Sequence, residues 1–182
     1  GKGRTILHAA ATKGHLKLVK QLVQNLEDKN PQDDHGITPL HCAAETGQLE
    51  VFKFLTPFLR ETNPTNPEIE SQYKNRSPLH FAAASGHLHI IEFFLENIYG
   101  DINPAMGNGD TVLYIAAQRG QLNVVEFYTG KLPNPNPGKD TSDEFRGRTP
   151  LHIAAQYGHL PVVQHICSLL SNKNPKDSDG ST

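Results

Sequence analysis

The sequence predicts an all-α solenoid in which short helix–turn–helix units follow one another along the chain. A segment with the sequence GITPLHCAAETG, at residues 36–47, is one of five related copies in the chain. Its central leucine falls at Leu7, Leu40, Leu79, Leu113 and Leu151, at steps of 33, 39, 34 and 38 residues, and a glycine follows each leucine by seven residues. A period of this size indicates units that cannot bury their apolar faces alone and therefore stack on their neighbours.

The second unit shows how each helix is encoded. Thr38 is a good N-cap, and Pro39 at the first helical position loses no N–H that the helix needs. The small Ala43 gives this first helix a face that neighbouring helices can approach closely, and Gly47 ends it. A second, more apolar helix is predicted to begin near Leu49. The first helix is too short to be stable alone, so it must lie between its copies in adjacent units.

This pattern resembles the ankyrin repeat, in its T-P-L-H-x-A-A core, in the Gly-His-Leu triplet at residues 14–16, 86–88 and 158–160, and in the apolar helix that follows. The resemblance implies an ankyrin-repeat solenoid of helix-turn-helix units with β-hairpin fingers. We expect a single array over residues 1–182. Its repeats cover about 3–35, 36–75, 76–108, 109–146 and 147–179, with a sixth cut off at 180–182. We also expect the array to continue beyond Thr182, because the last complete unit lacks the polar outer face of a capping repeat.

Seven of the ten histidines occupy fixed positions in the repeat. Four follow the central leucine and three follow the glycine: His8, His41, His80 and His152, and His15, His87 and His159. Such a number invites a metal-binding or catalytic interpretation. Their fixed place in the unit instead predicts side chains that bond the loop backbone of adjacent repeats.

An Asn-Pro pair follows the second helix of every unit, beginning at Asn30, Asn63, Asn103, Asn136 and Asn174. Asparagine tolerates turn geometry and proline stiffens the residues that follow. Two of the predicted fingers are longer than the others, and their extra residues are 65–75 and 138–146. Loops tolerate insertions at little cost, so a binding role for these fingers and simple length variation both remain open.

The bulk properties exclude several classes of function. The chain has 182 residues, 36% hydrophobic and 20% charged, with 17 Lys+Arg against 19 Asp+Glu. A net charge of −2 gives no reason to expect nucleic acid as a partner. No apolar run is long enough to cross a membrane. Only two cysteines occur, inside predicted helices, which fits a reducing compartment. We therefore expect an intracellular protein, cytoplasmic or nuclear, and a monomer for this piece of chain.

Two classes of function remain open. The first is a non-catalytic protein–protein interaction scaffold or adaptor. The alternative is a regulatory or substrate-docking ankyrin segment of a larger enzyme or channel, whose chemistry would lie outside these residues. No glycine-rich phosphate loop and no Ser–His–Asp or Cys–His order stands out. We therefore predict no enzyme activity, no cofactor and no metal for this chain.

The resemblance implies that a partner protein binds the concave face formed by the fingers and the first helices. Tyrosine and arginine, which dominate interface hot spots, gather with phenylalanine in the later fingers. An ordinary solvated surface is the alternative interpretation. The predicted partner-binding residues are Asp34, His35, Tyr73, Lys74, Arg76, Arg119, Phe145, Arg146, Arg148 and Tyr157.

The resemblance also implies one possible modification. A loop asparagine of ankyrin repeats can be hydroxylated by a 2-oxoglutarate-dependent asparaginyl hydroxylase. The favoured context is a leucine eight residues before the asparagine and an Asp-aliphatic pair directly before it. Leu95, Asp101 and Ile102 provide that context for Asn103. The alternative, which we favour, is that Asn103 simply stabilises a turn.

Overall fold

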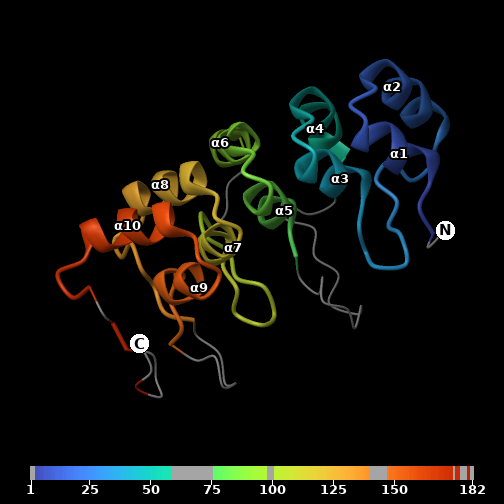
Figure 1. Cartoon of the computed structure of the whole chain (residues 1–182). Coiled ribbons are helices and arrows are strands. Elements are labelled where there is room, and N and C mark those ends of the chain that lie inside the picture. Colours follow the sequence, from blue (N-terminus) through green and yellow to red (C-terminus); the bar gives the residue numbers. More distant parts are fainter. Residues whose placement is uncertain are drawn as a thin grey trace. The chain divides into compact units, whose positions relative to one another are not determined.

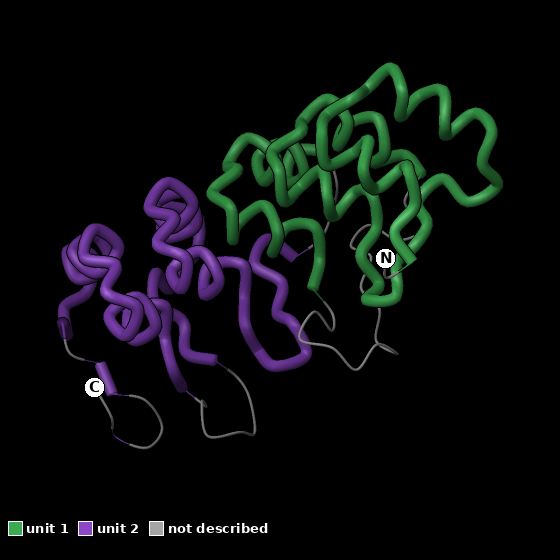
Figure 2. Tube along the Cα trace, turned by 45° about the vertical axis from the view of Figure 1, so that its right-hand side comes forward, with its two compact units in different colours: residues 1–100 green, residues 101–182 purple. Residues whose placement is uncertain are grey.

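The computed structural model of the chain describes residues 3–58, 76–97, 101–139, 147–173, 175–176 and 180. These residues form ten α-helices and one short 3₁₀-helix (Figure 1). The chain divides into two compact units, residues 1–100 and residues 101–182 (Figure 2). An array of helical units is therefore confirmed, whereas its description as a single array with the repeat boundaries given above stays a prediction.

Unit 1 contains three helix pairs. They are α1 (Ile6–Thr12) with α2 (Leu16–Asn25), α3 (Pro39–Glu45) with α4 (Leu49–Leu55), and α5 (Pro78–Ala84) with α6 (Leu88–Asn97). The 3₁₀-helix η1 (Thr56–Phe58) directly follows α4. The first helices α1, α3 and α5 pack on one another in a row, and the second helices α2, α4 and α6 form the adjoining row (Figure 1).

Unit 2 repeats this arrangement with two pairs. They are α7 (Val112–Gln118) with α8 (Leu122–Lys131), and α9 (Pro150–Gln156) with α10 (Leu160–Leu169). Helix α7 packs on α9, and α8 packs on α10. In both units the first helix of every pair is 7 residues long. A helix of that length depends on tertiary packing for its stability, as the sequence indicated.

The core is built from the repeated apolar positions. The central leucines Leu7, Leu40, Leu79 and Leu113 are fully buried, and Leu151 is nearly so. The paired alanines that follow them are buried throughout the first four repeats. Because an alanine has almost no side chain, the first helices can lie close together and the larger residues of the second helices fill the remaining space.

The start of each first helix is fixed by a hydrogen-bonded cap. Thr38 Oγ1 accepts the backbone N–H of His41 at 3.4 Å, and the backbone N–H of Thr38 donates to His41 Nδ1 at 3.2 Å. This reciprocal pattern satisfies two N–H groups at the helix start. Since Nδ1 accepts, the ring proton lies on Nε2, which donates to the carbonyl oxygen of Arg76 at 3.1 Å. The cap therefore also ties one repeat to the loop of the next.

The predicted role of the histidines is confirmed at four positions. His8 Nε2 bonds the carbonyl oxygen of Ile37 at 2.8 Å, as His41 does that of Arg76. After the glycine, His87 and His159 bond the carbonyl oxygens of Glu45 and Gln118 in the preceding repeats. For His152 the corresponding acceptor, at residue 181, lies outside the described residues. His15 is exposed to solvent, and no hydrogen bond of its ring is found among the described residues.

The first and third fingers close as tight turns, and the described residues contain no β-strand. In the first finger Asp33 N donates to Ile37 O at 2.8 Å, and in the third Met106 N donates to Asp110 O at 2.9 Å. A single antiparallel bridge, between Ala105 and Thr111, is the nearest approach to a sheet in the described chain. In these two fingers the expected β-hairpins are thus reduced to tight turns, because few residues separate Pro31 and Pro104 from the next helix cap.

Candidate partner-binding surface

Each unit presents an inner surface, by which we mean its fingers together with the C-terminal ends of its first helices. The repeat assigns two side-chain positions of every unit to this surface: the residue before the helix cap and the residue before the glycine. The first set is Arg4, Ile37, Arg76, Asp110 and Arg148, and the second is Lys13, Thr46, Ser85, Arg119 and Tyr157. The chemistry of these positions decides what the surface can bind.

In unit 1 an ion pair joins adjacent fingers. Arg4 Nε donates to Asp33 Oδ2 at 3.1 Å, and Asp33 Oδ1 accepts the backbone N–H groups of His35 and Ile37, each at 2.9 Å. Burial works to raise the pKa of the Asp33 carboxyl, but these hydrogen bonds outweigh it and the pKa lies below its ordinary value. Asp33 is fully buried while half of the Arg4 side chain remains in solvent. The Asp33 carboxylate therefore stabilises this finger through its hydrogen bonds to the backbone and to Arg4.

In unit 2 a buried lysine occupies the equivalent place. Lys139 Nζ lies 2.7 Å from Asp110 Oδ1, and both side chains are almost completely buried. The ammonium group also lies 5.1 Å from the centre of the Tyr114 ring, a cation–π contact. Tyr114 stands where the other repeats have a histidine. Its ring packs against the ammonium group of the next finger, whereas His8 and His41 donate a hydrogen bond to the next finger's backbone.

The ends of α7 and α9 enclose a hollow of about 310 Å³, lined by Gln118, Arg119, Tyr157 and His159. His159 Nε2 donates to Gln118 O at 2.9 Å, which fixes the imidazole between the two repeats. The Tyr157 ring stacks on this imidazole, with ring centres 6.3 Å apart and planes 9° from parallel. Tyr157 is 56% exposed. A large aromatic surface is thus presented to solvent in a fixed orientation.

One arginine lines this hollow, and a second bonds the residue next to Tyr157 in sequence. The Arg119 side chain is exposed, and no hydrogen bond or ion pair to its guanidinium is found among the described residues. Arg148 Nη1 donates to Gln156 Oε1 at 3.0 Å, directly beside Tyr157 in sequence. The exposed Arg119 and the rigid Tyr157 form the combination that recurs at protein-interface hot spots.

The structure describes six of the ten predicted binding residues. Arg119, Arg148 and Tyr157 lie on the inner surface of unit 2, where Arg119 and Tyr157 share the hollow. Asp34 and His35 form the tip of the first finger in unit 1, Asp34 exposed and His35 half-buried. Arg76 is also half-buried in unit 1, with its guanidinium 4.7 Å from the centre of the Phe81 ring. The remaining four, Tyr73, Lys74, Phe145 and Arg146, lie outside the described residues.

Sequence reasoning missed part of this surface. It took His159 only as a structural residue, yet its imidazole is the platform on which Tyr157 stacks. It also missed the buried pair of Asp110 and Lys139. The sequence does carry one indication of this pair. Tyr114 is the one residue after a central leucine that is not histidine.

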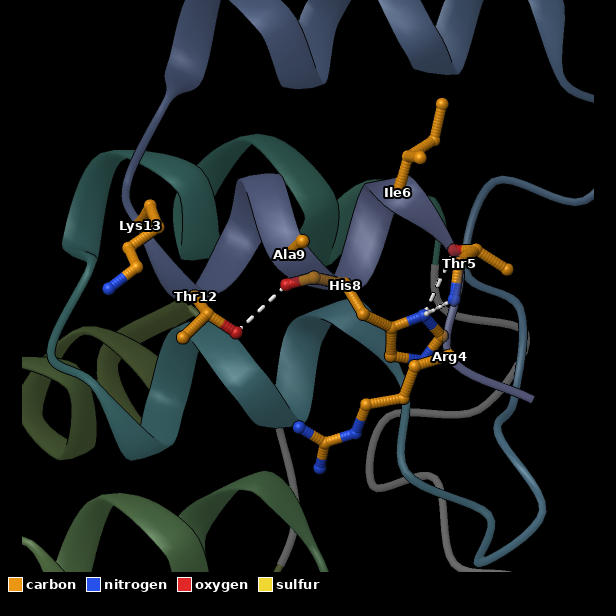
Figure 3. A pocket seen from close by; sticks show the side chains of 7 residues that line it. All are labelled: Arg4, Thr5, Ile6, His8, Ala9, Thr12 and Lys13. Carbon is orange, nitrogen blue, oxygen red and sulfur yellow. Dashed lines mark hydrogen bonds between the residues drawn. The ribbon is translucent and has the colours of Figure 1, made fainter. Parts of the chain in front are cut away.

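A second hollow, of about 470 Å³, runs along α1 (Figure 3). All seven of its lining residues come from residues 4–13, and the hydrogen bonds drawn there are local ones of His8 with Thr5 and Thr12. Ile6, 68% exposed, belongs to it, although Pro39 and Pro78 at the same position of the next two repeats are buried.

Asn103 makes the contacts expected of an asparagine that stabilises a turn. Its Oδ1 accepts the backbone N–H of Leu113 at 2.9 Å, and its own N–H donates to Asp101 Oδ1 at 2.9 Å. Asn136 bonds Leu151 in the same way at 2.9 Å, and Asn30 bonds Leu40 at 3.4 Å. The asparagine of the Asn-Pro pair thus fixes the next first helix. Hydroxylation of Asn103 stays a prediction.

Comparison with known families agrees with this architecture. The short first helices, the loop between repeats and the capped helix starts define a helical repeat protein. A family model for ankyrin repeats in three copies matches residues 1–65 and 57–131, and a model for a single ankyrin repeat matches residues 146–179. The chain therefore belongs to the ankyrin-repeat family. No curated protein matches it.

Members of this family generally act as protein–protein interaction modules and are typically non-catalytic. The matches leave residues 132–145 uncovered, which includes most of the longer finger predicted at 138–146. None of the helices described here has the length and apolarity needed to cross a membrane. Within the described residues no group of three or more His, Cys, Asp or Glu side chains is arranged to hold a metal ion.

Proposed function

We propose that this chain is a non-catalytic scaffold or adaptor that binds a partner protein through the inner surface of unit 2. The observation that carries the proposal is the hollow of Gln118, Arg119, Tyr157 and His159, with its exposed tyrosine stacked on a fixed imidazole. A rigid aromatic side chain loses little conformational entropy when a partner covers it, and an interface concentrates its binding energy in a few such anchors.

The proposal includes a cellular location and an oligomeric state for the chain. Both cysteines are free, Cys42 buried and Cys167 half-buried, which supports a reducing cytoplasmic or nuclear location. The chain is proposed to act as a monomer, with the partner supplying the second half of the interface. Sedimentation at increasing protein concentration should show a single species of constant mass.

Affinity purification from a cytosolic lysate tests the proposal. The bait is the chain itself, beside a variant carrying Arg119→Ala, Arg148→Ala and Tyr157→Ala. A matched control carries Lys13→Ala, Thr46→Ala and Ser85→Ala, the positions before the glycine in the repeats of unit 1. Circular dichroism and urea denaturation establish that both variants are folded.

We expect at least one protein to be recovered by the parent chain and by the control, and lost with the unit 2 variant. Recovery of the same proteins by all three baits would contradict a binding role for this surface. Turnover of a substrate by the chain, abolished by one substitution, would contradict the non-catalytic part of the proposal.

A further inference from the structure

The hollow of unit 2 combines one free cation with an aromatic platform. Among its four lining residues only Arg119 carries a permanent charge, and its guanidinium is exposed beside the Tyr157 ring. Gln118 contributes a neutral amide, and the proton of His159 Nε2 is already donated to a carbonyl oxygen. The recognition chemistry of the hollow is therefore set by a single guanidinium and one exposed ring.

The charges of the lining residues favour an anion in this hollow. A second arginine, Arg148, bonds Gln156, the sequence neighbour of Tyr157. The described part of unit 2 has three acidic side chains: Asp101 accepts the backbone N–H of Asn103, Asp110 is buried against Lys139, and Glu126 lies on the second helix α8. No acidic side chain lines the hollow. An anionic group that enters meets attraction from Arg119 and Arg148 without a competing carboxylate of the hollow itself.

We propose that the hollow takes the carboxylate of an aspartate or glutamate side chain in a peptide segment of the partner protein. This inference rests on the proposed function and names the chemistry of its partner. A guanidinium presents two parallel N–H groups that match the two oxygens of a carboxylate. One free guanidinium matches one negative charge, and the methylene groups of the acidic residue pack against the Tyr157 ring.

The equivalent places in unit 1 lack this combination. At the position before the glycine, unit 1 has Lys13, Thr46 and Ser85, and no aromatic side chain. His87, the counterpart of His159, lies against the ring of His89, with ring centres 5.7 Å apart. Lys13 therefore provides a matched control: it carries the same charge as Arg119, at the same repeat position, without the aromatic platform.

A phage-displayed library of random peptides tests the proposal. Selection runs in parallel on the parent chain, on Arg119→Glu, on Tyr157→Ala and on Lys13→Glu. We expect peptides enriched on the parent and on Lys13→Glu to carry an acidic residue at one fixed position, and to be depleted on Arg119→Glu. A synthetic peptide of the enriched sequence should bind Arg119→Gln about tenfold more weakly than the parent, the size of a typical hot-spot loss.

The acidic residue of that peptide is then replaced by its amide. A double-mutant cycle compares the two peptides on two chains. On the parent chain the amide peptide should lose its affinity. On Arg119→Gln the amide peptide should bind no more weakly than the acidic peptide does. Enriched peptides that depend on Tyr157 but show no acidic preference and no effect of Arg119→Gln would overturn the carboxylate inference while leaving the proposed surface intact. Enrichment that is equal on all four chains, or absent from the parent, would overturn both.

Discussion

The two units build the same contact between neighbouring fingers with the charges exchanged. In unit 1 the residue before the helix cap is Arg4 and its partner, 29 residues later, is Asp33. In unit 2 the equivalent residues are Asp110 and Lys139, again 29 residues apart. The repeat thus fixes the backbone positions of the contact and leaves the sign of each charge free. The same freedom applies to every side chain on the inner surface.

The difference between the two pairs is one of burial. Arg4 is 53% exposed, and the carboxylate of Asp33 keeps two backbone N–H bonds besides the arginine. Lys139 and Asp110 are both buried, and besides the lysine the Asp110 carboxylate accepts a hydrogen bond from the Asn108 side chain, Nδ2 to Oδ2, at 2.8 Å. Unit 2 therefore depends more strongly on its ion pair than unit 1 does.

The largest expected effect follows from breaking the buried pair. Replacing Lys139→Met leaves the Asp110 carboxylate buried without its cation and should lower the free energy of unfolding by about 3–5 kcal/mol. The exposed counterpart Arg4→Met should cost about 1 kcal/mol or less. Urea denaturation followed by circular dichroism measures both. In the double variant Lys139→Met with Asp110→Asn, most of the loss should be recovered; equal losses for the two single variants would refute the contrast.

A second comparison concerns two glycines of unit 2. Gly120 and Gly158 both have a positive φ, 69° and 74°, which costs an alanine about 1–2 kcal/mol. A Cβ at Gly120 would also lie 2.6 Å from His159 Nδ1, whereas one at Gly158 meets nothing within 4 Å. Gly120→Ala should therefore destabilise the chain by about 1–2 kcal/mol more than Gly158→Ala, because the imidazole platform must move. Similar unfolding midpoints would mean that His159 is free to shift.

A third effect separates the asparagines of the two units. Asn136 is buried and accepts the Leu151 N–H at 2.9 Å, whereas Asn30 is less buried and its bond to Leu40 N is 3.4 Å long. Asn136→Ala should cost about 1–2 kcal/mol and Asn30→Ala about half as much. Thermal melts of the two variants measure the order. A larger loss at Asn30 would show that hydrogen-bond geometry does not decide the contribution.

The smallest effect is a pH dependence located in unit 1. Burial lowers the pKa of His8 and of His87 below the ordinary histidine value. The unfolded chain then binds protons more readily than the folded chain, so the stability from these groups is complete above about pH 6.5 and is lost as the pH falls through their folded pKa. In the His8→Gln variant the stability should fall less steeply as the pH decreases. Urea denaturation midpoints measured above and below that pH test this. An unchanged slope would assign the dependence to other groups.

The sequence predicted what lies within one repeat and missed what joins two repeats. For the second unit, the sequence predicted the cap at Thr38, the proline at the first helical position and the end of the first helix before Gly47. Each of these features depends on neighbours a few residues away. The pairing of Asp110 with Lys139 and the stacking of Tyr157 on His159 depend on how side chains fill the space at the loops. Periodicity specifies that such positions meet, and it does not specify the rotamers they adopt.

The same reasoning explains the outcome for the predicted surface. Arg119 and Tyr157 each precede a glycine and line the same hollow. Arg76 precedes a helix cap, as Arg148 does, but its guanidinium lies over the Phe81 ring. Phe81 gives Arg76 a partner within the chain. This contact requires both residues, so the position of the arginine in the repeat does not predict it.

The most direct test of the central claim is hydrogen–deuterium exchange of the chain with and without the partner recovered by affinity purification. The account predicts slower exchange on binding at the ends of α7 and α9, residues 118–121 and 156–159, with no change at residues 12–15 of unit 1. Protection confined to the second helices α8 and α10, or to unit 1, would contradict binding through the inner surface of unit 2.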